Sequence, residues 1–162
     1  MTYLHRMDDS IGLEAKQRIA CIDLCLNHKE VFTGDVLKET LTDLLSDAVP
    51  AQVLMRTAIR AAQIYSEIKK FVLSTVVPNL IKKKVWLIAP KVWEGIAPCV
   101  KMLIKDDAKD LRDSEATLRC LLGLPGPQLK LVLKQADKAK VQYFSYIISN
   151  QYTNDDTLGS NG

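Results

Sequence analysis

Apolar residues recur along most of the chain at the spacing of an amphipathic helix. Ala15, Ile19, Ile22 and Leu26 fall on one face of a helix that Ser10 could cap and that ends near Asn27. The same spacing predicts further helices at about 33–48, 50–65, 66–80, 90–103, 115–123, 127–136 and 137–150. No stretch shows the two-residue alternation of a β-strand.

The apolar stripes also predict which side chains form the core. Large apolar residues at helical register are expected to be buried, since they remove the most surface from water. The residues assigned to the core on this basis are Leu44, Phe71, Trp93, Ile96, Val100 and Phe144.

Prolines and glycines divide the helical pattern. Pro78 falls inside the 66–80 stripe, where it removes a backbone hydrogen bond and should kink or split the helix. Pro50 and Pro90 suit the first turns of new helices. Gly95 and Pro98 make the 90–103 helix irregular, and "GLPGP" at 123–127 separates the next two.

These elements predict one all-α domain over residues 10–150. The helices form either HEAT-like stacked helical hairpins or a compact helical bundle, and the spacing of helix pairs, ~40 residues, suits such repeats. Residues 1–9 are expected to be a flexible segment, 105–115 an exposed loop insertion, and 151–162 a disordered tail.

Composition agrees with a globular domain that has a core of its own. Of 162 residues, 48% are hydrophobic and 25% are charged. The sequence contains no apolar run of the ~20 residues that a membrane helix needs, and "MTYLHRMDDS" lacks the apolar stretch of a signal peptide. Cys21, Cys25, Cys99 and Cys120 each lie among apolar neighbours, which favours reduced core thiols over disulfides.

Positive charge is concentrated in the middle of the chain. Residues 66–105 carry eight basic and two acidic side chains, a net charge of +6, although the whole chain is only +3. A basic block of this kind suggests an anionic partner, either nucleic acid or an acidic protein segment.

No set of residues in the sequence suggests catalysis or a cofactor. Neither histidine belongs to a zinc-protease motif, and neither a phosphate-binding loop nor an esterase elbow is present. Cys21, Cys25 and His28 share a helix face, but a tetrahedral zinc site lacks a source for its fourth ligand. We therefore expect no metal and no cofactor. The acidic cluster of Asp106, Asp107 and Asp110 is interpreted as solvated charge.

The segment "LIKKKVWLIAPKVWEG", residues 80–95, contains both tryptophans. One interpretation makes Trp86 and Trp93 stacking platforms for single-stranded RNA, with lysines on the phosphates. The alternative packs Trp93 in the core and leaves the lysines as a solvated rim. We favour the second, because tryptophans in a small domain mostly bury area.

Four stretches of the sequence together resemble the C-terminal domain of symplekin, the Pta family. They are "VLMRTAI" (53–59), "LIKKKVW" (80–86), "PKVWEGI" (90–96) and "CLLGLPGPQLKLVL" (120–133). The resemblance covers about residues 10–150. It implies a nuclear, non-catalytic scaffold of pre-mRNA 3′-end cleavage and polyadenylation, with an all-α fold.

The resemblance also implies protein partners. They are the C-terminal domains of the endonuclease subunit and of its inactive paralogue, and the hinge segment of the cleavage stimulation factor. RNA binding through residues 80–93 is the less favoured alternative, and no membrane partner is expected. The residues that we predict to contact a partner are Lys82, Lys83, Lys84, Trp86 and Lys91, with Arg56 and Arg60 as a second patch.

Overall fold

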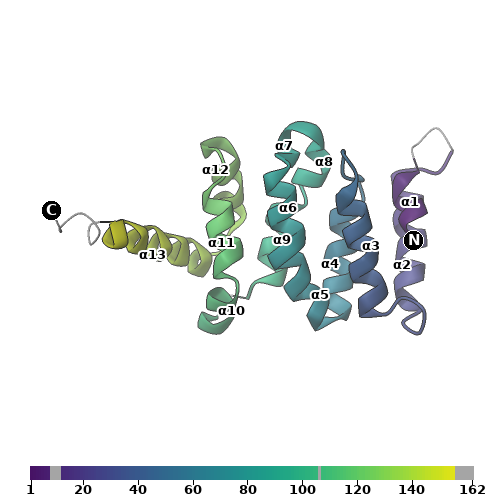
Figure 1. The fold of residues 1–162 in the computed structure, drawn as a ribbon, viewed down its shortest axis with the longest axis horizontal. Helices are drawn as coiled ribbons and strands as arrows, with labels where there is room; N and C mark the ends of the chain where they lie inside the picture. Colours follow the sequence, from purple (N-terminus) through teal and green to yellow (C-terminus); the bar gives the residue numbers. More distant parts are fainter. Residues whose placement is uncertain (8–11, 106, 156–162) are drawn as a thin grey trace.

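The computed structural model describes residues 1–7, 12–105 and 107–155, and this part of the chain is helical with no strand (Figure 1). The first helices are α1 (Thr2–Arg6), α2 (Ala15–Asn27), α3 (Gly34–Ser46), α4 (Leu54–Ile64), α5 (Ser66–Phe71) and α6 (Val77–Lys82), with the π-helical turn η2 (Val72–Val76) between the last two. The remaining helices are α7 (Val85–Ile88), α8 (Pro90–Trp93), α9 (Ile96–Leu103), α10 (Ala108–Asp113), α11 (Glu115–Leu122), α12 (Gly126–Gln135) and α13 (Lys138–Asp155). The prediction of an all-α fold is confirmed.

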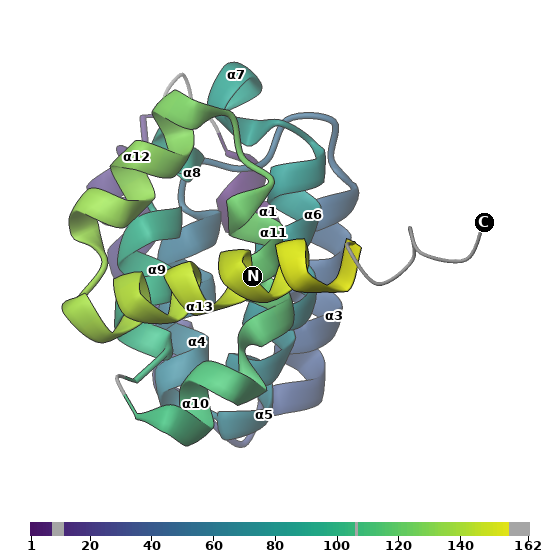
Figure 2. The same cartoon turned by 90° about the vertical axis from the view of Figure 1, so that its left-hand side faces the viewer.

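The helices are stacked in two layers. In one layer α2 contacts α4, α4 contacts α9 and α9 contacts α12. In the other layer α1 contacts α3, α3 contacts the α5–η2 helix, and α6 contacts α11. Figure 2 views the stack from its end and separates the two layers, with α13 lying across that end. The layers face each other, so each helix buries one stripe against the opposite layer.

The core lies between the two layers. Leu44, Ile96 and Val100 are buried there, and Phe144 of α13 is buried at the end of the stack (Figure 2), each at most 2% exposed. Phe71 and Trp93, assigned to the core from sequence, are only half-buried and pack against its edge. Their neighbours Val72 and Val92 are the fully buried residues, and successive side chains on a helix diverge by about 100°.

The sequence predicted that Pro78 would kink or split its helix, and the α-helix is interrupted just before Pro78 by a π-helical turn while the chain stays helical. The chain runs helically from Ser66 to Lys82, and the proline lies in the first turn of α6. The preceding turn is π-helical, and the Val77 N–H donates to the carbonyl oxygen of Val72. A π-turn shifts the hydrogen-bond register by one residue. The helix thereby continues past a residue that has no N–H to donate.

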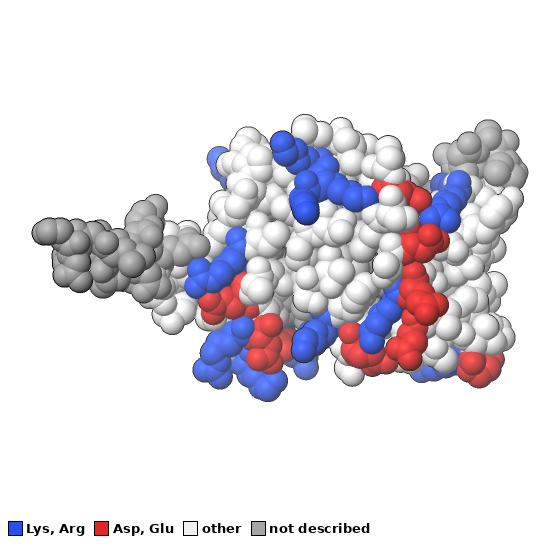
Figure 3. Space-filling model, in the orientation of Figure 1, with Lys and Arg blue, Asp and Glu red and all other residues white. Residues whose placement is uncertain are grey.

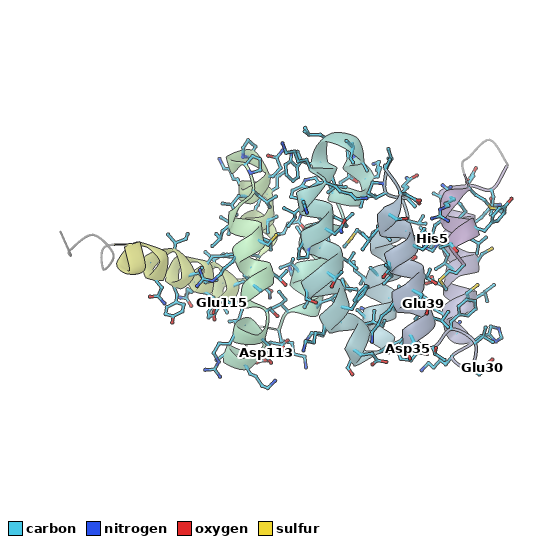
Figure 4. All side chains as sticks on the ribbon, in the orientation of Figure 1. His5, Glu30, Asp35, Glu39, Asp113 and Glu115 are labelled. Carbon is cyan, nitrogen blue, oxygen red and sulfur yellow. The ribbon has the colours of Figure 1, made fainter. Side chains whose placement is uncertain are left out.

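The N-terminal residues are ordered, unlike the flexible segment predicted for 1–9. Helix α1 packs against α2 and α3, and its His5 is 3% exposed. His5 Nδ1 donates to the Met1 carbonyl oxygen at 3.1 Å, and Nε2 lies 2.8 Å from the Thr57 hydroxyl. Figure 4 shows His5 beside α3. Residues 8 and 9 lie outside the described residues.

The segment predicted as an exposed loop, 105–115, contains helix α10. The Asp107 side chain caps this helix by accepting from the Asp110 N–H at 2.9 Å, and Leu111 is buried. The sequence shows no apolar stripe here because the helix has only six residues and Leu111 is its one buried side chain. Asp106 itself lies outside the described residues.

Several helix ends differ from the prediction. Helix α2 starts at Ala15, where Glu14 and Gln17 form a capping box, and the predicted cap Ser10 lies outside the described residues. Helix α4 starts at Leu54, four residues after Pro50. Helix α13 extends to Asp155 into the predicted disordered tail, and 156–162 lie outside the described residues.

The four cysteines are free thiols. Cys99 is fully buried, which raises its pKa to about 12, whereas Cys21, Cys25 and Cys120 are only half-buried. The prediction of four core thiols is confirmed for Cys99. Cys120 packs against the core as a half-buried residue, and the prediction is wrong for Cys21 and Cys25. No helix in the described ranges is both long and apolar enough to span a bilayer.

The burial of His5 makes stability depend on pH. Desolvation lowers the pKa of His5 below 6.5, so the unfolded chain takes up this proton at a higher pH than the folded chain. Well above pH 6.5 neither state is protonated at His5. As the pH falls through about 6.5 the unfolded state takes up the proton first, and stability is lost by at most about 1.4 kcal/mol per pH unit. We expect the free energy of unfolding to fall more steeply between about pH 7 and about pH 5.5 for the wild type than for His5→Gln.

Urea unfolding at several pH values measures this difference. Parallel pH profiles for the wild type and His5→Gln would contradict the assignment of the effect to His5.

Candidate partner-binding surface

The tryptophan segment forms a reversal between α6 and α9. Lys83 ends α6, and Lys84 adopts a left-handed conformation with φ of 53°. Helix α7 then runs to Ile88, Ala89 has an extended φ of −146°, and Pro90 starts α8. Lysine rarely adopts positive φ, so the surrounding contacts hold the chain in this turn.

Lys83 is turned inward toward α3 rather than outward to a partner. Its Nζ donates to the carbonyl oxygen of Asp47 at 2.7 Å and to that of Leu45. Both carbonyls belong to the C-terminal end of α3, where helix carbonyls lack intrahelical partners. A cation there is also favoured by the helix dipole. Lys83 thus joins the end of α6 to the end of α3.

The two tryptophans pack against each other. Their ring centroids are 5.8 Å apart at an interplanar angle of 73°, an edge-to-face pair. Both rings are half-buried and contact the core. A base-stacking platform needs a free ring face, and this packing covers part of each ring.

Three of the predicted lysines, Lys82, Lys84 and Lys91, stay exposed. Lys82 and Lys84 are solvated, next to Leu87, which is 69% exposed. Figure 3 shows basic side chains near the ends of α6 and α7, and a column of acidic side chains over α3 on the same face. The acidic residues lie one turn apart along and just after α3, namely Asp35, Glu39, Asp43 and Asp47. Figure 4 labels the first two.

A groove between α4 and α9 brings together residues from both predicted patches. It has a volume of about 340 Å³ and belongs to the layer opposite α3. Arg56 and Arg60 come from α4, and Lys91 comes from α8. The residues that line the groove are Gln52, Met55, Arg56, Ile59, Arg60, Gln63, Lys91, Gly95, Pro98 and Met102.

The groove has an apolar base and a polar rim. Met55 is buried at its base, Ile59 is half-buried, and Met102 is 54% exposed. Sequence reasoning did not assign Met102 to a surface. The available signal in the sequence was a methionine directly after Lys101.

The rim cations form loose ion pairs with neighbouring carboxylates. Arg56 Nη2 lies 3.6 Å from Asp23 Oδ2, and Arg60 Nε lies 3.5 Å from Asp23 Oδ1. Lys91 Nζ lies 3.4 Å from Glu94 Oε2. All five side chains are partly exposed, so each pair contributes at most about 1 kcal/mol to stability.

Two residues of the candidate metal and acidic sites, His28 and Asp110, contact neighbouring side chains of the chain itself. His28 ends α2, and its Nδ1 lies 3.2 Å from Glu30 Oε1. No group of three metal-ligating side chains occurs among the described residues. Asp110 accepts from Lys69 Nζ at 2.8 Å and from the Lys105 N–H at 2.9 Å, and the lysine hydrogen bond lowers the pKa of Asp110.

Sequence reasoning missed a cavity of about 500 Å³ between α10, α11 and α13. Tyr143 and Tyr146 line it, with ring centroids 5.6 Å apart. The Tyr143 hydroxyl donates to Glu115 Oε2 at 3.0 Å, and Arg119 pairs with the same carboxylate. The hydrogen bonds from Arg119 and Tyr143 lower the pKa of Glu115. These contacts attach α13 to α11.

The fold and the groove define a class of protein: an all-helical, two-layer domain with an open groove rimmed by cations. Residues 1–136 match the family described as symplekin tight junction protein C terminal. The chain therefore belongs to the symplekin C-terminal family, as the motifs at 53–59, 80–86, 90–96 and 120–133 indicated. The match includes α1 and α10 and ends before α13. No solved structure matches the chain.

Proposed function

We propose that this chain is a non-catalytic scaffold of pre-mRNA 3′-end processing. In this role it docks the C-terminal domains of the endonuclease subunit and of its inactive paralogue, within the nucleus. Family membership over residues 1–136 is the observation that carries the proposal. The hinge segment of the cleavage stimulation factor is the further protein partner that we assign on the same basis.

The geometry supports docking of a protein rather than chemistry on a small molecule. The α4–α9 groove is open and combines apolar and cationic side chains. Protein-binding helical stacks commonly use such extended surfaces between successive helices. We therefore place a partner contact on Arg56, Arg60 and Lys91, and a second on the exposed Lys82 and Lys84 beside Trp86. Lys83 is removed from the predicted set because it binds α3.

Reconstitution from purified components tests this function. The whole chain is mixed with the co-expressed C-terminal domains of the endonuclease and its paralogue, and the mixture is separated by size-exclusion chromatography. We expect one co-eluting complex at about 1–10 μM, the affinity range of specific interfaces of moderate size. Separate elution of the components at these concentrations would refute the assignment.

RNA binding is tested alongside on a labelled single strand. Contacts between lysines and phosphates predict a steep loss of affinity between about 50 mM and about 200 mM salt. The scaffold proposal expects the complex of protein subunits to form without RNA. A protein complex that requires added RNA would favour the RNA-binding alternative.

A further inference from the structure

Acidic residues are absent from three neighbouring helices of one layer, although Asp23 of α2, Glu94 and Asp137 lie at their edges. Helices α4, α9 and α12 are consecutive neighbours in one layer, and none of them contains an acidic residue. Their basic residues are all exposed, namely Arg56, Arg60, Lys101, Lys130 and Lys134. The acidic column on α3 lies in the opposite layer. The α4–α9–α12 face therefore attracts an anionic partner.

The two arginines of the groove share a single carboxylate within the chain, and Arg60 Nη1 also donates to Gln63 Oε1 at 3.3 Å. Asp23 on α2 is the carboxylate that both contact, at 3.6 Å from Arg56 and 3.5 Å from Arg60. These distances exceed the ~2.7–2.9 Å of a charge-assisted hydrogen bond. One carboxylate thus serves two guanidinium groups, each of which can bind a carboxylate through two parallel hydrogen bonds.

The spacing of the arginines matches one helical turn. Arg56 and Arg60 are at i and i+4 on α4, so their Cβ atoms lie about 5–6 Å apart. A partner helix laid along α4 with carboxylates one turn apart would reach both guanidiniums. The apolar positions of such a helix would face Ile59, Pro98 and Met102 in the groove.

We propose that the α4–α9 groove binds an acidic amphipathic helix of a partner protein. Carboxylates one turn apart bind Arg56 and Arg60, and the apolar face of the helix packs on Ile59 and Met102. Asp23 occupies part of the position that a partner carboxylate takes, and so competes with it. This inference specifies the partner chemistry of the scaffold proposed above and depends on that proposal only in taking the ligand to be a protein.

A designed peptide titrated into the whole chain tests the groove. The probe is a fluorescein-labelled helical peptide with glutamates at i and i+4 on one edge and leucines on one face. We expect Arg60→Glu to weaken binding by about tenfold or more, because it replaces an attraction by a repulsion. Asp23→Asn should strengthen binding by a few fold, since it removes the competing carboxylate.

Matched variants and probes separate the groove from general charge. Lys70→Glu makes the same change of charge on exposed α5 in the opposite layer and should leave the affinity unchanged. A peptide with lysine in place of glutamate should not bind. Circular dichroism confirms that each variant is folded.

The inference would be overturned if the acidic peptide did not bind up to about 1 mM. It would also be overturned if Arg60→Glu and Lys70→Glu lost the same affinity for the peptide, or if Asp23→Asn bound the peptide more weakly than the wild type. Displacement of the peptide by oligouridylate at lower concentration than by excess unlabelled peptide would assign the groove to RNA and also overturn it. Complex formation with the endonuclease domains is measured separately. A complex that forms while the peptide fails refutes only the groove assignment, whereas peptide binding without a complex refutes only the scaffold function.

Discussion

Replacing Gly95 by alanine is expected to lower the free energy of unfolding by about 2–3 kcal/mol. A Cβ atom at Gly95 would lie 2.6 Å from Met55 Cβ and 3.3 Å from the Val92 carbonyl oxygen. Met55 Cβ is attached directly to the α4 backbone, so no side-chain rotation relieves the contact. The turn between α8 and α9 would have to move away from α4, which also changes the groove that Gly95 lines.

Urea denaturation of the wild type and the variant measures the effect. Gly123→Ala is the matched control, because its nearest contact would be an ordinary one at 3.4 Å. We expect that control to stay within about 0.5 kcal/mol of the wild type. Equal stabilities for the two alanine variants would show that α4 and the α8–α9 turn are not held in this close contact.

Replacing Lys83 by methionine is expected to lower the free energy of unfolding by about 1.5–3 kcal/mol. Methionine keeps an unbranched stem but removes the ammonium that binds the Leu45 and Asp47 carbonyl oxygens. These carbonyls end α3, and in the variant they lose both hydrogen bonds and the favourable charge at the helix C-terminus.

The neighbouring lysine provides the control. Lys82→Met removes the same charge from an exposed side chain and should change stability by less than about 0.5 kcal/mol. Binding of the endonuclease domains is measured on both variants. If Lys83→Met were as stable as the wild type and yet lost the partner, Lys83 would act at the surface, as the sequence had predicted.

Helical periodicity predicted most helices because each buries a stripe against the opposite layer. Leu44, Ile96 and Val100 were assigned to the core on that basis and are buried. The same reasoning overestimated burial at Phe71 and Trp93, where the adjacent valine faces the core. The size of an aromatic side chain suggests that it is buried, but the register of the helix decides which residue points inward.

Proline and short polar segments were harder to interpret. Pro78 is accommodated because η2 shifts the hydrogen-bond register, a choice that no local propensity encodes. Helices α1 and α10 are too short to show a stripe, and their stability comes from contacts with distant elements. His5 and Thr57, for example, meet across 52 positions of the sequence.

The partner-binding surface, too, was only partly predictable from the sequence. Basic residues at 56, 60, 82–84 and 91 were visible as candidates in the sequence. Only the folded chain shows that Lys83 turns to α3, whereas Arg56, Arg60 and Lys91 share a groove. The rim carboxylate Asp23 comes from α2, more than thirty positions earlier in the sequence.

The sequence by itself determined the helical class, the family motifs and the concentration of positive charge in the middle of the chain. These are properties of residue order and local spacing, which are present before the chain folds. The tertiary structure decided the two-layer stack, the separation of acidic α3 from the α4–α9–α12 face, and which cations remain available to a partner. Those features depend on contacts between residues far apart in the sequence, and such contacts exist only once the helices have packed.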